Sequence, residues 1–454
     1  MIIRNPATLE PLGTVPECGA DEVARAVAAA HSAQAEWVRV SAASRAGLLR
    51  GIGGRIRARA SELAALLTRE TGKPLCESVD CIGAAAALFE ACGARESVPP
   101  LEAPAGVVAV LVPFNFPLLL MASAVAPALA AGGTVVCKPP HQNPLTVALF
   151  AELCGALPPG AVNVVTGGAD AGRALIEHPG IGGVMFTGSA AAGREIAAAA
   201  PRKRLDLELG CVGAFIVRED ADLDAAVPGI AWARLQSGGQ VCTSGKHIYV
   251  DRSIAAEFVE RMHQCVGFLD VDDPMKPPTD LGPLISLEAA LRVEDQVGRA
   301  LREGAKLILG GRRFRPSGLP GHFFQPTILA DVRPGGVPTR EEILGPVITV
   351  TPVAGAAEAI RLAEESSPGF GASIFTNDPG AVIRMLESAE AGTFRINDPA
   401  DGEVPGPFGG MRHGGIRRVL GARTSLAVAH VEAAPVMRPK AWWFPYRDRT
   451  VPRS

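Results

Sequence analysis

Cys242 is the residue whose surroundings most favour covalent chemistry. It lies in residues 237–243, Ser-Gly-Gly-Gln-Val-Cys-Thr, where small neighbours leave room for a substrate carbon to approach the sulfur and let backbone N–H groups turn toward it. The thiolate is the nucleophile, so either the thiol pKa must be lowered from about 8.5 or the proton must be removed during attack. A cysteine beside glycine is also a common packing residue, and this motif alone leaves both roles open.

Two other residues could supply a general base and an oxyanion donor. Glu208 lies among leucines near the end of a predicted strand in residues 205–210, and a partly desolvated carboxylate has a raised pKa that suits a base near neutral pH. Asn115 lies between two phenylalanines and two prolines in residues 113–117, a rigid setting from which its amide could donate to a developing oxyanion. The structural alternatives are a Glu208 carboxylate paired with an arginine and an Asx turn at Asn115.

Residues suited to a dinucleotide occupy other turns. Gly188 and Ser189 follow an apolar run and open a helical one, so backbone N–H groups there could receive a pyrophosphate. Their spacing, Gly-x-x-x-x-Gly, differs from the common Gly-x-Gly-x-x-Gly fingerprint. Lys138, which two prolines follow, could bind a ribose or neutralise a phosphate. Glu341 and Glu342 precede a Gly-Pro turn, and one of them could bind a second ribose. The structural alternative for Lys138 and for the two glutamates is a solvated position on the surface.

The elements that would position these residues are those of an α/β fold. Short apolar runs alternate with helical segments rich in alanine and leucine, which predicts right-handed crossovers and a Rossmann-like, doubly wound parallel sheet. Ligands of such sheets bind outside the carboxyl ends of the strands, where the turns that carry Asn115, Lys138 and Gly188 fall. The predicted strands are residues 106–112, 134–137, 161–165, 183–186 and 205–209, and the predicted helices between them are residues 118–131, 146–157, 169–178 and 190–200.

Helices precede this sheet. Residues 21–71 show apolar positions at helical spacing, with Asp21 as the predicted N-cap of residues 22–37. A further helix starts at Ser61 and ends before Gly72, because glycine supplies a left-handed cap and a proline two residues later forbids continuation.

A second lobe and a different tail follow the sheet. Strands and helices alternate again from about Phe215 to Phe408, which predicts a second α/β lobe. In the tail, residues 425–436 could form one strand, and residues 441–446 are an aromatic cluster.

The bulk composition excludes several classes of protein. Hydrophobic residues make up 48% and charged residues 20% of the 454, which allows two large cores and argues against global disorder. The net charge of −3 argues against a broad nucleic-acid or membrane-binding surface.

Prolines interrupt the most apolar stretch, residues 106–131, so we expect no membrane span. The N-terminal residues lack the features of a signal peptide. Nine cysteines without a CxxC pair fit a reducing cytoplasm, and we assign no metal site.

Taken in their order along the chain, these motifs closely resemble those of the aldehyde dehydrogenase superfamily. The most specific matches are residues 113–117, 186–189, 207–210, 239–243 and 341–347, and the resemblance extends from residue 5 to residue 410. It implies that Cys242 attacks an aldehyde carbon, while the amide of Asn115 and the backbone N–H of Cys242 hold the oxyanion. It further implies that Glu208 activates the water that hydrolyses the resulting thioester. The prediction is an NAD(P)-dependent, non-acylating aldehyde dehydrogenase.

The same resemblance implies a set of cofactor-binding residues. Lys138 would bind the adenosine ribose, Gly188 and Ser189 the pyrophosphate, and Glu342 the nicotinamide ribose. His141 stands where many NAD-preferring members have a glutamate that binds the adenosine ribose hydroxyls. Losing that carboxylate removes repulsion against a 2′-phosphate, so the cofactor prediction stays NAD or NADP.

Three further positions differ from the family pattern. Leu344 replaces a frequent phenylalanine near the nicotinamide, and Phe114 replaces a frequent tryptophan; both changes stay apolar and reshape the pocket. Cys211 replaces a second glycine after residue 210 and is interpreted as a packing residue, with a redox pair with Cys242 as the alternative.

The domain prediction follows the family's arrangement. Residues 1–210 form the NAD(P)-binding domain, which a short oligomerisation segment interrupts near residues 94–106. Residues 211–410 form the catalytic domain, and residues 411–454 form a small β oligomerisation element with the aromatic tail. Because the segment near 94–106 is short for the family, the prediction is a homodimer that acts on a small-molecule aldehyde in the cytoplasm.

Three competing functions differ in testable features. A CoA-acylating semialdehyde dehydrogenase generally lacks a glutamate at the position of Glu208, and an acyl-phosphate reductase is disfavoured by the same hydrolytic base. A non-catalytic protein on this scaffold would not need Cys242, Glu208, Asn115 and Lys138 together.

Overall fold

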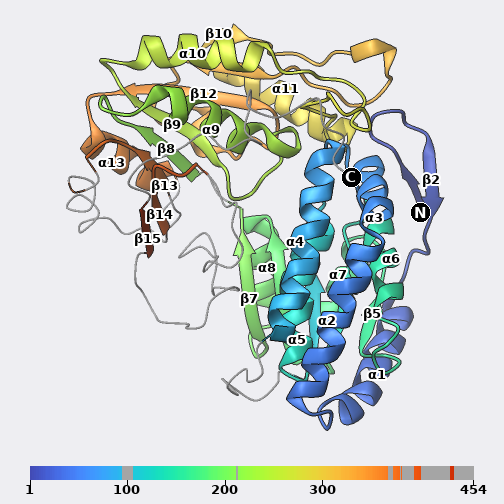
Figure 1. Cartoon of the computed structure of the whole chain (residues 1–454). Coiled ribbons are helices and arrows are strands. Elements are labelled where there is room, and N and C mark those ends of the chain that lie inside the picture. The colour runs from blue at the N-terminus through green and yellow to red at the C-terminus, as the bar shows by residue number, and fades with distance from the viewer. Residues whose placement is uncertain are drawn as a thin grey trace.

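The computed structural model describes residues 1–94, 106–210, 213–366, 372–378, 380, 393–399 and 430–433. Figure 1 shows two lobes, each built around its own sheet, with a small N-terminal hairpin beside the first lobe. The hairpin pairs β1 (Ile2–Arg4) with β2 (Pro11–Thr14) in antiparallel fashion and was not predicted. The two α/β lobes confirm the predicted fold class.

The sheet of the first lobe is parallel throughout and has the strand order β5-β4-β3-β6-β7. From β3 the chain moves outward through β4 and β5 and then returns to β6 and β7 on the other side. This is the predicted doubly wound topology, and its switch point lies between the carboxyl ends of β3 and β6. The strands are β3 (Val107–Leu111), β4 (Thr134–Lys138), β5 (Val162–Val164), β6 (Gly183–Gly188) and β7 (Arg204–Leu209), and the intervening helices are α5 (Pro117–Ala130), α6 (Leu145–Leu153), α7 (Ala169–Glu177) and α8 (Ala190–Ala199).

Four helices precede this sheet: α1 (Ala20–Trp37), α2 (Ala42–Ala58), α3 (Ala60–Thr71) and α4 (Leu75–Ala94). The N-cap predicted at Asp21 is wrong. The cap is Gly19, whose N–H donates a hydrogen bond of 2.8 Å to the side chain of Glu22, and Asp21 lies in the first turn. Gly72 ends α3 with a φ of 84°, which confirms the predicted left-handed cap.

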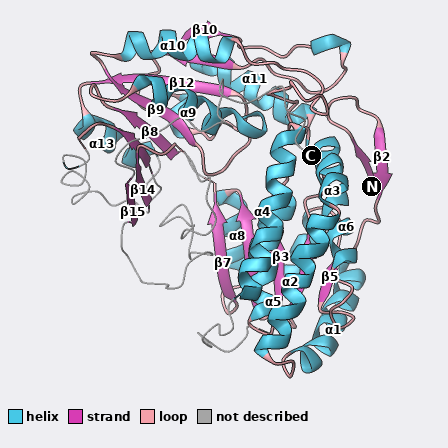
Figure 2. Ribbon diagram, viewed as in Figure 1, coloured by secondary structure: helices cyan, strands magenta, loops and turns pink. Residues whose placement is uncertain are grey.

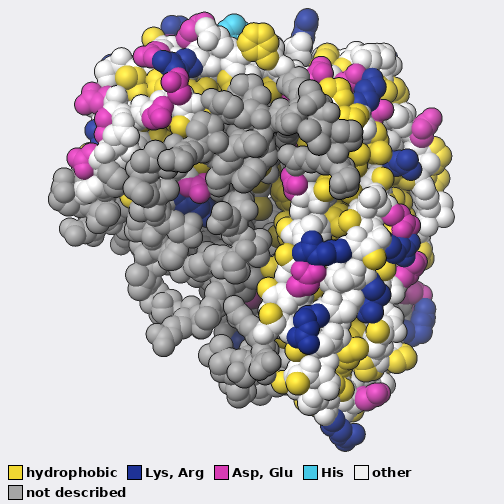
Figure 3. All heavy atoms as spheres, viewed as in Figure 1, with side chains coloured by type: hydrophobic (Ala, Val, Ile, Leu, Met, Phe, Trp, Pro, Cys, Tyr) yellow, Lys and Arg dark blue, Asp and Glu magenta, His cyan; other side chains and the backbone are white. Residues whose placement is uncertain are grey.

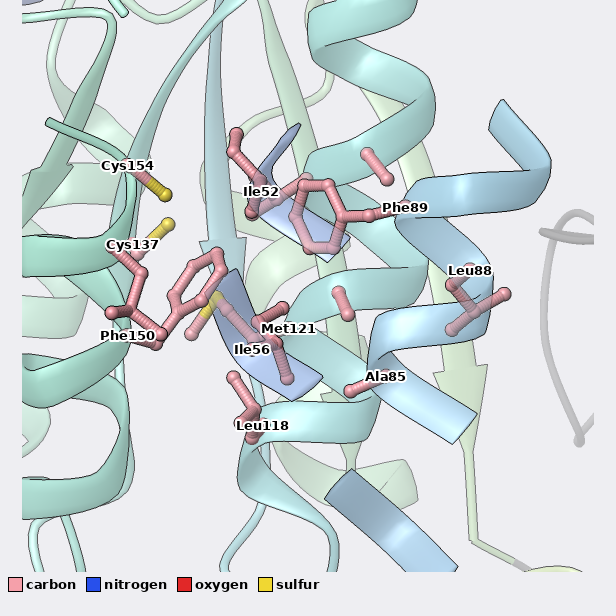
Figure 4. Close-up of a cluster of buried hydrophobic side chains, with 14 of the residues drawn as sticks. Ile52, Ile56, Ala85, Leu88, Phe89, Leu118, Met121, Cys137, Phe150 and Cys154 are labelled. Atoms are coloured by element: carbon pink, nitrogen blue, oxygen red, sulfur yellow. The ribbon is translucent and has the colours of Figure 1, made fainter. Parts of the chain in front are cut away.

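The core of this lobe fixes α2 and α4 over the sheet. Figure 4 shows side chains from α2, α4, α5, β4 and α6 packed together, including the rings of Phe89 and Phe150, whose centroids are 5.6 Å apart. Burying each such side chain stabilises the fold by about 1.5–3 kcal/mol. The start of α4 is thereby held against the second lobe, where the backbone N–H of Leu75 donates a hydrogen bond of 2.9 Å to the carbonyl of Pro274.

The sheet of the second lobe has the order β10-β11-β12-β9-β8-β13-β14-β15, and β10 alone pairs antiparallel with its neighbour among the described strands. Figure 2 shows these strands side by side with helices around them. The strands are β8 (Gly213–Val217), β9 (Gly245–Asp251), β10 (Lys306–Leu309), β11 (Thr327–Ala330), β12 (Val347–Val353), β13 (Ala372–Phe375), β14 (Thr393–Ile396) and β15 (His430–Ala433), and the helices are α9 (Leu223–Leu235), the 3-10 turn η1 (Gln236–Gly239), α10 (Ala255–Gly267), α11 (Leu287–Arg302), the 3-10 turn η2 (Pro316–Gly318), α12 (Val337–Arg340) and α13 (Ala356–Ser366).

Several predictions fall outside the described residues. They concern most of the segment predicted for oligomerisation, Cys211 and the aromatic residues of the tail. Of the strand predicted over residues 425–436, the structure describes β15, which pairs parallel with β14. The domain boundaries at residues 210 and 410 stay predictions.

Candidate active site

The loop that carries Cys242 is a tight turn between α9 and β9 of the second lobe. Three successive residues in it, Ser237, Gly238 and Gly239, have positive φ angles of 52°, 65° and 73°. Glycine adopts such angles at little cost, and Gly239 also has no room for a side chain, since a Cβ there would lie 2.0 Å from the carbonyl oxygen of Gly345. The small residues before the cysteine therefore serve the backbone path that leads to it.

Two buried charged side chains hold this loop, and neither was predicted to act there. A carboxylate oxygen of Glu77, on α4 of the first lobe, accepts a hydrogen bond of 2.7 Å from the backbone N–H of Ser237. The guanidinium of Arg234, at the end of α9, donates to the carbonyls of Gly239 at 3.0 Å and Ile343 at 2.8 Å. The one sequence signal for both is a charged residue within a largely apolar helix.

The amide of Asn115 reaches the same loop from the first lobe. Its Nδ2 donates a hydrogen bond of 2.7 Å to the carbonyl of Gln240, and its Oδ1 accepts one of 3.1 Å from the backbone N–H of Phe116. The Asn115 side chain is buried beside the loop of Cys242. An amide nitrogen carries two hydrogens, so one N–H remains to meet an oxyanion while the other fixes the orientation. The structure thus brings the predicted oxyanion donor to the predicted nucleophile.

The loop of Asn115 is itself anchored from a neighbouring turn. The buried side chain of Asn143 donates a hydrogen bond of 2.7 Å to the carbonyl of Phe114, a half-buried residue. The rigidity that the two prolines predict for residues 113–117 is therefore supported by a second amide, which bonds the loop of Asn115 itself.

Charged groups from both lobes act on the thiol of Cys242. Burial raises its pKa to about 11; Lys246 opposes this shift, and the carboxylates of Glu342 and Glu208 add to it. Glu208 is buried at the carboxyl end of β7, next to Thr187 of β6 in the sheet register. The predicted nucleophile and base therefore lie within electrostatic reach of each other. Lys246 was not predicted.

Residues predicted to bind a dinucleotide lie at the carboxyl ends of β4 and β6. Lys138 ends β4, where burial lowers the pKa of its ammonium and its Nζ donates to the carbonyl of Pro139 at 3.2 Å. Ser189 is exposed and caps α8, its Oγ accepting from the N–H of Ala192 at 3.2 Å. A Cβ on Gly188 would lie 2.4 Å from the ring of Phe186. A helix N-terminus behind a side-chain-free residue fits a pyrophosphate, which needs close approach to backbone N–H groups.

The remaining cofactor predictions lie on both lobes. Glu342, from the second lobe, reaches the end of β7: a Cβ on Gly210 would lie 2.7 Å from its Oε2. Leu344 is half-buried close by in sequence. His141 is exposed in the turn after β4; burial and the charge of Lys138 lower its pKa, and two carboxylates raise it. The ring of His141 thus lies within electrostatic reach of Lys138.

The described residues contain no group of three or more His, Cys, Asp or Glu side chains that could hold a metal ion. None of their helices is both long and apolar enough to cross a membrane. On the face shown in Figure 3, acidic and basic side chains of the described residues are intermingled over the helical lobe.

Comparisons with known proteins show the family of this chain. The model of the aldehyde dehydrogenase family matches residues 1–432. The chain is 38% identical over 436 residues to 3,6-anhydro-α-L-galactose dehydrogenase of Streptomyces coelicolor, covering 91% of this chain and 88% of that protein. It is 35% identical to the succinate-semialdehyde dehydrogenase (NADP⁺) of Escherichia coli, covering 92% of this chain and 90% of that protein.

Solved structures give the same result. A 3,6-anhydro-L-galactose dehydrogenase in complex with NAP superposes with a TM-score of 0.88 at 31% identity, covering 93% of each chain. The lactaldehyde dehydrogenase of Escherichia coli superposes with a TM-score of 0.87 at 32% identity, covering 92% of this chain and 91% of that one. With the match of the family model over almost the whole sequence, these similarities show that this chain belongs to the aldehyde dehydrogenase family, the NAD(P)-dependent enzymes that oxidise aldehydes.

Proposed function

We propose that Cys242, Asn115 and Glu208 carry the oxidation of an aldehyde to a carboxylic acid. The observation that supports this most is the convergence of three distant segments: the Asn115 amide bonds the backbone of the nucleophile loop, and the charge of Glu208 acts on the Cys242 sulfur. A nucleophile, an oxyanion donor and a base at one point are the requirements of acyl transfer through a covalent intermediate.

The chemistry divides into two halves. Attack of the Cys242 sulfur on the aldehyde carbon forms a C–S bond and moves an electron pair to the carbonyl oxygen, while the thiol proton passes to Glu208 or to solvent. The oxyanion is held by the free amide N–H of Asn115 and the backbone N–H of Cys242. When bound, NAD(P)⁺ supplies the hydride acceptor that converts this adduct to a thioester.

Hydrolysis then restores the enzyme. Glu208, as the carboxylate, takes a proton from water as the water oxygen attacks the thioester carbon. The C–S bond then breaks to release a carboxylic acid, and the proton on Glu208 passes to the departing sulfur, which restores both the Cys242 thiol and the carboxylate. A carboxylate in a largely apolar setting suits this role, because desolvation makes it a stronger base than it is in water. The presence of Glu208 supports water over CoA as the acyl acceptor.

We further propose that Lys138 and His141 hold the adenosine ribose, Gly188 and Ser189 the pyrophosphate, and Glu342 the nicotinamide ribose, with Phe114 and Leu344 as apolar walls. His141 in place of a carboxylate is compatible with NAD and with NADP. The substrate is a small-molecule aldehyde, and the active form is a cytoplasmic homodimer. The proposed division has a cofactor domain to residue 210, a catalytic domain to residue 410 and an oligomerisation tail.

Two substitutions test the proposed function. Cys242→Ala should keep the thermal midpoint of the wild type and form no reduced cofactor, whereas Cys265→Ala, which removes a half-buried thiol of α10, should keep full turnover. Glu208→Gln should release a burst of about one equivalent of reduced cofactor per subunit and then turn over slowly, because the thioester accumulates. Oxidation by Cys242→Ala at the wild-type rate would rule out the assigned nucleophile, and a linear progress curve for Glu208→Gln would rule out the assigned base. Product analysis with and without CoA distinguishes acid from acyl-CoA.

A further inference from the structure

Lys246 is a buried cation that the proposed chemistry has not used. It lies near the start of β9, four residues after Cys242, and only 2% of its surface is exposed. Its Nζ donates to the backbone carbonyl of Cys242 at 3.0 Å and to that of Ser244 at 2.9 Å, and it lies 3.4 Å from Oε1 of Glu342. The ammonium therefore folds back over the loop that carries the nucleophile.

A buried ammonium is costly to the fold unless it is paired and hydrogen-bonded. Removing such an ion from water costs several kcal/mol, and a pair of similarly shaped apolar residues is often no less stable. Here two of its N–H groups meet the backbone carbonyls of Cys242 and Ser244 and the Glu342 carboxylate lies against it, so the ion has the partners that burial requires. Burial of the Lys246 ammonium is therefore better explained by its electrostatic effect on Cys242 and Glu342 than by a gain in folding stability.

The charges around the Cys242 sulfur indicate what effect the Lys246 ammonium has. Among the described residues, the ionisable groups that act on the Cys242 thiol are Lys246 of β9, Glu342 of the segment before β12, and Glu208 of β7. Arg234 of α9 is a further cation whose charge interacts with Glu342, but its two Nη atoms bond backbone carbonyls. A thiolate that forms here adds a third negative charge, and within the part of the chain that the structure describes Lys246 is the cation that acts on the sulfur.

We propose that Lys246 is a positioning residue for Cys242: its ammonium fixes the backbone of the nucleophile and supplies the positive charge that lets a thiolate form beside Glu208 and Glu342. This inference rests on the proposed function, in which Cys242 is the nucleophile. The contact with Glu342 adds a link to the cofactor side, because the carboxylate assigned to the nicotinamide ribose is held by the same ammonium that holds the nucleophile loop.

The test measures the ionisation of Cys242 in the cofactor-free enzyme. Iodoacetamide is neutral and reacts with the thiolate, so its rate at pH 8.5 follows the thiolate fraction. The modified cysteine is identified by peptide mass spectrometry, and the Cys242→Ala protein gives the background rate. Lys246→Met should alkylate on the order of tenfold more slowly, which is one pKa unit, while Lys246→Arg, which keeps the charge, should stay closer to the wild type.

Removing a negative charge near Cys242 gives the second part of the alkylation experiment. Glu342→Gln removes a carboxylate that opposes the thiolate and leaves Lys246 in place, so alkylation at pH 8.5 should become several-fold faster. A residue that only supports the fold would not change the rate in opposite directions at the two positions. An alkylation rate in folded Lys246→Met equal to or above that of the wild type overturns the proposal. If Lys246→Met does not fold, the proposal is instead overturned by an alkylation rate in Glu342→Gln that is no higher than that of the wild type.

These outcomes are separate from the fate of the proposed function. Turnover by Cys242→Ala would remove the nucleophile assignment whatever the alkylation rates are. Conversely, an inactive Cys242→Ala protein together with unshifted alkylation in the two charge variants would leave Cys242 as nucleophile and remove only the role of Lys246.

Discussion

The side-chain amide of Asn115 donates a hydrogen bond of 2.7 Å to the carbonyl oxygen of Gln240, across 125 residues of sequence. One residue comes from the turn after the first strand of the cofactor lobe, and the other lies two positions before Cys242 in the second lobe. The bond therefore sets the distance between the proposed oxyanion donor and the proposed nucleophile, which belong to different lobes. The second N–H of the Asn115 amide is the one that would donate to the substrate oxygen.

Asn115→Ala should reduce kcat on the order of a hundredfold, since removing one oxyanion donor typically costs about 3 kcal/mol of transition-state stabilisation. Steady-state kinetics with a good aldehyde substrate measure this. The matched control is Asn143→Ala, which removes the amide that bonds the carbonyl of Phe114 in the same loop and leaves the Asn115 donor to Gln240 in place. The control should lower the thermal midpoint and retain most of kcat. Equal losses of kcat in the two variants would mean that Asn115 acts only through loop rigidity.

Glu77→Ala should lower both the stability and kcat, with a smaller effect on KM. The carboxylate accepts from the N–H of Ser237, and a buried hydrogen bond to a charged group contributes about 1.5–3 kcal/mol. Without it, the strained backbone before Cys242 loses an anchor from the other lobe.

The control for this prediction lies on the same helix. Glu90 of α4 forms an exposed ion pair with Arg57, and such pairs contribute about 0–1 kcal/mol, so Glu90→Ala should leave kcat unchanged and barely move the thermal midpoint. A Glu77→Ala enzyme with the kinetics of the Glu90→Ala enzyme would contradict the anchoring role.

The sequence was sufficient for the sheet that carries the site but not for the bonds that join the lobes. The five parallel strands were predictable because each is a short run, apolar or alternating as in β7, that a turn closes, which is a local signal. Glu77 was missed because a side chain that bonds the backbone of a distant segment leaves no periodic pattern. Lys246 was missed because a lysine beside a strand start looks like a surface residue until its burial is known. The cap at Gly19 was missed for a different reason: both Asp21 and Glu22 are plausible caps in sequence, and only the geometry shows which carboxylate turns back to the helix start.

Gly239→Ala should prevent formation of the native nucleophile loop. Its φ of 73° is unfavourable for alanine, and the added Cβ would lie 2.0 Å from the carbonyl oxygen of Gly345, which is backbone and cannot easily move away. We expect loss of dehydrogenase activity and a fall of several degrees or more in the thermal midpoint, read by differential scanning calorimetry. Gly54→Ala on α2 is the control: nothing lies within 4 Å of the new Cβ, and alanine in a helix stabilises by about 0.5–1 kcal/mol. A Gly239→Ala enzyme with wild-type activity would show that the loop tolerates another path.

His247 should make the second lobe sensitive to acid. It is fully buried on β9, with its two ring nitrogens hydrogen-bonded to the hydroxyls of Thr349 at 2.8 Å and Thr351 at 2.7 Å. Burial lowers the pKa of the imidazole from 6.5 to about 3, so the folded state binds the proton less tightly than the unfolded state does. The stability that this neutral ring contributes is complete above pH 6.5 and declines as the pH falls toward 3, at about 1.4 kcal/mol per pH unit. Between pH 7 and pH 5 the wild type should therefore lose about 2 kcal/mol of stability through this residue, measured as the shift of the urea midpoint.

His247→Gln should be less stable than the wild type at pH 7 but should lose less stability between the two pH values. His31→Gln, at an exposed site on α1, should follow the wild type. Parallel pH curves for the wild type and His247→Gln would show that this histidine does not drive the acid response.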